Sequence, residues 1–181
     1  ASGTSANVLI GSGGVLNLGG TLTYTATNNS NGATISGAGT LNLNSARAFA
    51  VGDSTAASQD LTINSIIADG SAASSINKTQ AGTLVLGGNN TYSGGTTLTL
   101  GTLGVSHNSA LGSGGLTLAG TVTLQAVAND VTLANAVSGT TITLTISGTK
   151  NLTLNGGLTS TGDITLTNSI GAGKLLTIGS L

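Results

Sequence analysis

The sequence predicts an all-β protein with the fold of a right-handed parallel β-helix, a rod of stacked coils also called a β-solenoid. Three features of the 181 residues predict it: apolar residues alternate with polar ones in short runs, Gly-Thr dipeptides recur at a fixed spacing, and proline is absent. Alternation with a period of two indicates strands rather than helices. The absence of proline suits strands that need every backbone N–H for pairing on both sides.

The Gly-Thr dipeptides define a 19-residue repeat, because Gly82, Gly101, Gly120 and Gly139 follow one another at that interval. Gly20 and Gly39 share the interval, and the longer stretch from Gly39 to Gly82 accommodates two repeats with a five-residue insertion. About nine coils in one domain are therefore expected. Their predicted boundaries are 1–19, 20–38, 39–57, 58–81, 82–100, 101–119, 120–138, 139–159 and 160–181.

Each coil is predicted to carry inward apolar residues and an outward threonine. The expected inward pairs include Leu22/Tyr24, Leu41/Leu43, Leu84/Leu86, Leu103/Val105, Val122/Leu124 and Ile164/Leu166. A single coil cannot bury its own apolar face, so the coils must stack. An antiparallel β-sandwich is the alternative, but it would not require constant residue types at a fixed spacing. The expected outward column consists of Thr21, Thr40, Thr83, Thr102, Thr121, Thr140 and Thr161.

The composition excludes several classes of function. Only 5% of the residues are charged, against about 25% in an average globular protein. The four Lys and Arg residues are scattered singly, so neither nucleic acid nor an anionic membrane surface is an expected partner. No apolar run is long enough to span a membrane, and the chain contains no cysteine for disulfides or thiolate metal sites.

Residues that could perform catalysis are few. His107 is the only histidine, and we expect it in an exposed loop. Glycosidases need two carboxylates about 5–10 Å apart, and only Asp53, Asp60 and Asp69 could converge in this way. A polysaccharide-processing enzyme therefore remains a remote alternative. We expect no catalytic residue, no metal site and no cofactor.

Residues 82–124 contain a string of four motifs, Gly82-Thr83-Leu84, Asn90-Thr91-Tyr92-Ser93-Gly94-Gly95-Thr96-Thr97, Gly101-Thr102-Leu103 and Ala110-Leu111-Gly112. They resemble the autotransporter-associated β-strand repeat of bacterial type V secreted passengers, and the 19-residue coil is similar to that of filamentous haemagglutinin. This resemblance implies a secreted or cell-surface protein of an outer-membrane bacterium that serves as a shaft, spacer or adhesin, and it brings no catalytic residues with it.

Neither end of the predicted solenoid carries a polar or helical cap. Either the coils continue in a longer chain, or subunits stack end to end into a filament. Stacking would use Leu175, Leu176 and Ile178 at one end and Val8 and Ile10 at the other. We therefore expect a non-enzymatic structural shaft or filament subunit, with self-assembly or the rest of a longer passenger as its partner. The alternative is an adhesin that binds surface glycans, biofilm ligands or host receptors.

Overall fold

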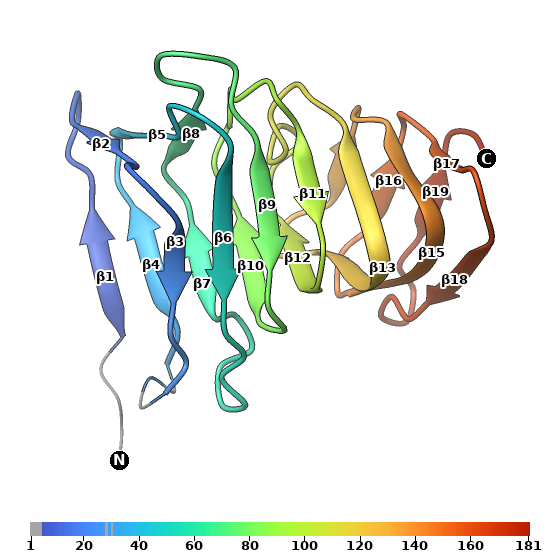
Figure 1. The fold of residues 1–181 in the computed structure, drawn as a ribbon. Coiled ribbons are helices and arrows are strands. Elements are labelled where there is room, and N and C mark those ends of the chain that lie inside the picture. The colour runs from blue at the N-terminus through green and yellow to red at the C-terminus, as the bar shows by residue number, and fades with distance from the viewer. Residues whose placement is uncertain (1–4, 28, 30) are drawn as a thin grey trace.

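The computed structural model describes residues 5–27, 29 and 31–181, and all its regular elements are β-strands stacked along one axis (Figure 1). None of these residues forms a helix that could cross a membrane. The first strands are β1 (Ala6–Leu9), β2 (Val15–Asn17), β3 (Leu22–Tyr24), β4 (Ala33–Ser36), β5 (Thr40–Asn42), β6 (Arg47–Val51), β7 (Leu61–Ile63), β8 (Ile66–Ala68), β9 (Ile76–Thr79) and β10 (Thr83–Leu86). The others are β11 (Thr96–Leu98), β12 (Gly101–Val105), β13 (Leu116–Ala126), β14 (Val131–Leu133), β15 (Val137–Gly148), β16 (Leu152–Leu154), β17 (Leu158–Ser160), β18 (Ile164–Asn168) and β19 (Leu176–Ile178).

The strands form three faces of a solenoid, and all pairs among the described residues are parallel. Face A contains β1, β4, β7, β10, β12, the second parts of β13 and β15, and β18. Face B contains β3, β6, β9, β11, the first parts of β13 and β15, and β17. Face C contains β2, β5 and β8 near the N-terminal end and β14, β16 and β19 near the C-terminal end.

This arrangement confirms the predicted all-β solenoid, but it has about seven turns instead of nine. The strand register shows why the coil count was wrong. Only β10 and β12 pair with the 19-residue interval, joining Thr83 to Thr102. On face B, Leu22 pairs with the more distant Phe49 and not with the expected Leu41. The right-handed sense and the single domain stay predictions.

The early coils are longer because loops extend from the corners of the stack. Residues 52–60 form one such loop between β6 and β7. Extra residues in a loop do not disturb the pairing of the strands, because the register depends on which strands pair and not on the number of residues between them. As a result, Gly20 and Gly39, which were predicted to occupy equivalent corners, are packed differently. A Cβ atom on Gly39 would collide with the Ile10 side chain, whereas one on Gly20 would meet nothing within 4 Å.

The core is a narrow column of stacked aliphatic side chains. On face A, Leu84, Leu103, Leu124 and Ile146 occupy one inward column in register, and all four are fully buried. This stacking explains why few aromatic residues are needed. Burial decreases toward both ends of the rod, where β1 and β18 are exposed along their whole length.

Candidate functional surfaces

The N-terminal end of the solenoid exposes the inner side of its first coil. Val8 aligns with the buried Ile35, yet 45% of its surface is exposed, because β4 is the only strand among the described residues that pairs with β1. An apolar cavity of about 370 Å³ opens here, and Val8, Leu22 and Tyr24 are among the side chains that line it. Ile10, which we expected at this edge, is instead buried, and its N–H donates to the Ser36 carbonyl at 2.8 Å.

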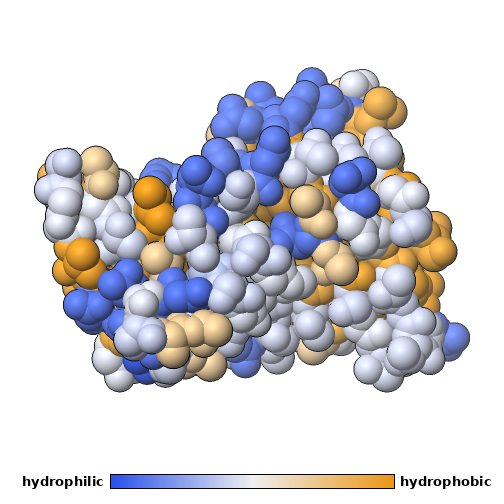
Figure 2. Space-filling view, turned by 90° about the horizontal axis from the view of Figure 1, so that it is seen from above, coloured by the Kyte–Doolittle hydropathy of each residue, from blue (hydrophilic) through white to orange (hydrophobic). Residues whose placement is uncertain are grey.

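The C-terminal end also exposes core positions. Ile164 and Leu166 on β18 continue the buried columns of Ile142 and Leu144, but each is 37% exposed. Strand β18 is the last strand of face A, and among the described residues only β19 on face C follows it, so its free side stays uncovered. Figure 2 shows apolar side chains gathered at this end of the rod.

The predicted stacking residues at this end are only partly exposed. Leu175 is 67% exposed, as stacking would require. Leu176 and Ile178 pair with Leu152 and Leu154 on face C and are half-buried. Sequence reasoning assigned Ile164 and Leu166 to an inward column but did not identify them as an end surface. Their exposure depends on their place at the edge of the described stack, which no local pattern reveals.

Threonines stack on the outer side of face A, in an order that differs from the predicted column. Two adjacent outward columns form, which we call the threonine ladder. Both run over strands without a single charged residue. The first column joins Thr83, Thr102, Thr123, Thr145 and Thr167, and the second joins Thr121, Thr143 and Thr165.

The predicted seven-residue threonine column is therefore wrong as a single column. Of its members, Thr83 and Thr102 are neighbours, and Thr121 lies in the second column of the ladder. Thr40 lies on face C between Val15 and Ile66. Thr21, Thr140 and Thr161 are exposed but lie outside the ladder. The reason is the variable coil length, which a constant 19-residue interval cannot follow.

The motif around Tyr92 has a structural role. The Tyr92 ring is fully buried, and its hydroxyl hydrogen-bonds the Thr96 hydroxyl at 2.6 Å. Burial raises the pKa of Tyr92 far above its usual value, although the Thr96 hydrogen bond opposes this rise. Asn90 accepts from the Ile67 N–H at 2.8 Å and donates to the Ala110 carbonyl at 2.6 Å. This side chain joins neighbouring coils on face C, where no strand forms between β8 and β14.

The candidate catalytic residues are engaged in local structure. His107 is exposed, and its Nδ1 accepts the Ser109 N–H at 3.0 Å. Asp60 is buried and accepts the N–H groups of Ser54 and Thr83 at 2.7 and 2.8 Å. Asp53 is exposed in the loop of residues 52–60.

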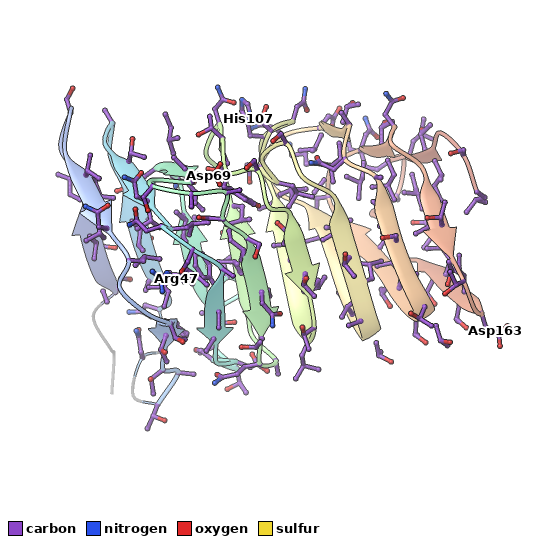
Figure 3. All side chains as sticks on the ribbon, turned by 45° about the horizontal axis from the view of Figure 1, so that its top comes forward. Arg47, Asp69, His107 and Asp163 are labelled. Atoms are coloured by element: carbon purple, nitrogen blue, oxygen red, sulfur yellow. The ribbon has the colours of Figure 1, made fainter. Side chains whose placement is uncertain are left out.

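Asp69 likewise binds backbone groups. It accepts the Ser74 N–H at 2.7 Å, the Ser93 N–H at 2.9 Å and the Ser93 hydroxyl at 2.7 Å. Desolvation acts to raise the pKa of Asp69, but the hydrogen bonds from Ser93 and Ser74 outweigh it and lower the pKa. Figure 3 shows Arg47 and Asp163 far apart along the rod. No three His, Cys, Asp or Glu side chains in the described part of the chain form a group that could hold a metal ion.

Two comparisons with known proteins agree with this solenoid. A family described as the passenger-associated-transport-repeat matches residues 76–105. The Adhesin BmaC autotransporter of Brucella suis biovar 1 (strain 1330) is 49% identical over 63 residues. These residues are 35% of this chain and 2% of that adhesin, so the chain spans a small part of its relative's length. No solved structure matches.

The matches confirm the predicted resemblance to bacterial autotransporter passengers. They also support the secreted or cell-surface location in a Gram-negative bacterium that the resemblance implied. The matched repeat contains the motif of Asn90 and Tyr92 and the 19-residue coil between β10 and β12. The matched repeat therefore includes the one pair of strands, among the described residues, that keeps the predicted 19-residue interval.

Proposed function

We propose that this chain is a segment of a non-enzymatic extracellular shaft, which projects an adhesive passenger away from a bacterial cell. One observation supports the proposal: within the described residues, the parallel stack ends on face A in strands β1 and β18, each of which pairs along one edge only and leaves apolar core positions uncovered. Unpaired edges of this kind favour pairing with another strand. In a solenoid each coil contacts only its neighbours, so a further coil can stack on an exposed end.

The occupant of these end surfaces is either another coil of the same passenger or a second copy of this chain. Direct stacking of two copies would bring β18 against β1, with Leu166 and Val8 near the junction. Neither edge strand carries a charged residue, so electrostatic repulsion between the two strands would not oppose the contact. Self-stacking would produce an open filament, since the contact is head-to-tail and does not close.

Electron microscopy and sedimentation over a range of concentrations would test self-stacking. We expect filaments that shorten when Ile164 and Leu166 are both replaced by Lys, because the new charges enter the apolar junction. Thr165 and Thr167, both replaced by Lys, provide the matched control. These residues lie on the same strand but point outward, so filaments should persist.

The outcomes separate the two occupants. Filaments that survive the Ile164→Lys and Leu166→Lys changes would contradict stacking through this end. Single short rods at every concentration would exclude self-stacking and leave coils of a longer passenger as the partner. Hydrolytic activity on polysaccharides would contradict the non-enzymatic role.

A second candidate function, direct adhesion, is favoured by the threonine ladder. Its hydroxyl groups repeat on a surface without charge, which suits hydrogen bonding to a neutral polar ligand such as a glycan. Binding to a glycan array should fall when Thr123, Thr145 and Thr143 are replaced by Val, which keeps the shape but removes the hydroxyl. The matched control replaces Thr97, Thr117 and Thr159 on face B. Equal loss from both variants would contradict a binding site on face A.

A further inference from the structure

Buried polar side chains gather in one stretch of the solenoid. Among the residues that the structure describes, all but Asn135 lie within residues 54–96, and this set consists of Ser54, Asp60, Ser65, Ser74, Lys78, Asn90 and Thr96. The coil length changes within the same stretch. On face B, a long coil separates Arg47 from its partner Ile76, but a much shorter coil separates Ile76 from its next partner, Thr96. The polar contacts therefore coincide with the junction between long and short coils.

Lys78 lies inside the core at this junction. It occupies an inward column between Phe49 and Leu98, and its side chain is fully buried. Its Nζ donates to the carbonyls of Thr79 and Gln80 in its own coil, at 3.1 and 2.8 Å. A third bond reaches the Leu100 carbonyl in the next coil at 3.0 Å. One ammonium group thus ties two successive corners together.

Three other side chains make the same kind of connection. Asp60 joins Ser54 to Thr83 of the next coil. Asp69 joins Ser74 to Ser93 of the next coil. Asn90 joins Ile67 of the preceding coil to Ala110 of the following one.

Hydrophobic packing alone does not specify the register at this junction. The inward residues are Leu61 and Ile63 on β7 and Leu84 and Leu86 on β10. A shift of two residues would still place aliphatic side chains inward, because side chains alternate with a period of two. The same shift would separate the buried polar groups from their partners, which is unfavourable in an apolar interior.

We propose that Asp60, Asp69, Lys78 and Asn90 form a register clamp, a conformational device that selects how the long N-terminal coils stack on the short C-terminal coils. The clamp acts through geometry. Each member has partners in two coils, so only one alignment satisfies all four side chains. The clamp goes beyond the shaft function, because it concerns which stack forms and not what the stack does.

Disulfide trapping can measure the register directly, since the chain has no cysteine of its own. Asn77 and Thr97 are partners on the outer side of face B, so Asn77→Cys with Thr97→Cys reports the native register. Thr79→Cys with Thr97→Cys reports a shift of two residues. In the native register these two Cα atoms are about 8 Å apart, which is too far for a disulfide without backbone movement.

Four changes remove the clamp, namely Lys78→Met, Asn90→Ala, Asp60→Asn and Asp69→Asn, and each cysteine pair is introduced into this variant. We expect the shifted disulfide to rise at least several-fold, while circular dichroism still reports β-structure. Asn135→Ala provides the matched control. Asn135 is another buried asparagine, which donates to the Gly112 and Gly114 carbonyls away from the junction. This control should lower stability without producing the shifted disulfide.

A clamp variant that loses stability but forms only the native disulfide would overturn the proposal, since the polar groups would then stabilise without selecting register. If this variant does not fold, Lys78→Met alone decides between the same outcomes. Methionine retains the core volume and removes a buried charge, a replacement that is often neutral or stabilising. A shifted disulfide in a variant as stable as the original would separate register selection from stability.

Discussion

At the residue scale, the most informative side chain is Lys78. Burial lowers its pKa to about 8, although the charge of Asp60 partly opposes this change. The three carbonyl partners satisfy the hydrogen bonds of the ammonium group but do not replace its hydration. The structure therefore retains a charged group in an apolar core, at a cost in stability near neutral pH.

This cost predicts an unusual dependence of stability on pH. The pKa of Lys78 is lower in the folded chain than in the unfolded chain, so the unfolded chain binds more protons between the two values. Stability should therefore rise as the pH increases from about 8 toward 10, by at most about 3 kcal/mol. Urea unfolding at several pH values up to about 9.5 would measure it.

The pH range ends at about 9.5 so that the ionisation of the buried tyrosines does not contribute to the measurement. Burial raises the pKa values of Tyr24 and Tyr92, and their ionisation at higher pH would lower stability. Lys78→Met should abolish the rise between pH 8 and 9.5. A stability that is flat or falls with pH in the unmodified chain would contradict the assigned pKa of Lys78.

At the element scale, the corners that connect the strands differ in how tightly they are packed. The corner between β8 and β9 contains an exposed segment, residues 70–73, whereas the corner before β11 is tightly packed. A Cβ atom on Gly94 would lie 2.7 Å from the Ser74 backbone. Coil length can therefore vary at the first corner but not at the second.

A pair of insertions tests this difference. Two glycines inserted between Ser71 and Ala72 should cost less than about 1 kcal/mol, because lengthening an exposed loop has a small entropic cost. The same insertion between Gly94 and Gly95 should cost at least about 2 kcal/mol, since it displaces the bonds that join Gly94 to Ser74 and Ile76 to Gly95. Urea denaturation would measure the stability of both variants. Equal losses of stability would contradict the idea that the exposed loop tolerates insertions and the packed corner does not.

At the scale of the whole molecule, stability is expected to vary along the rod. Coils contact only their neighbours, so the middle coils are supported on both sides and the end coils on one side. Strands β10, β12 and β13 combine buried inward columns with partners on both sides. Strands β1 and β18 have one partner each and are exposed.

Amide hydrogen exchange would show this gradient. Protection should be greatest in β10, β12 and β13 and should decrease toward β1 and β18, because strands at the ends open by local unfolding. Uniform protection along the chain would indicate that the solenoid unfolds as one cooperative unit. Protection of β18 that increases with protein concentration would instead support end-to-end stacking.

The fold class, the resemblance to passengers and the direction in which most side chains point all follow from the order of the amino acids alone. Alternation with a period of two decides which side chains face the core, and Leu84, Leu103 and Leu124 were correctly assigned in this way. Tyr24 was also placed correctly in the core. These properties are local, so they can be inferred from the spacing of a few residues.

The register, the number of turns and the end surfaces become known only from the folded chain. Register depends on pairing between strands that lie a whole coil apart in the sequence, and loops of variable length hide it from any fixed interval. The 19-residue interval therefore predicted the pairing of Thr83 with Thr102 but missed that of Leu22 with Phe49. Lys78 could not have been assigned to the core from its residue type, because its burial depends on carbonyl groups that the folded corners bring together.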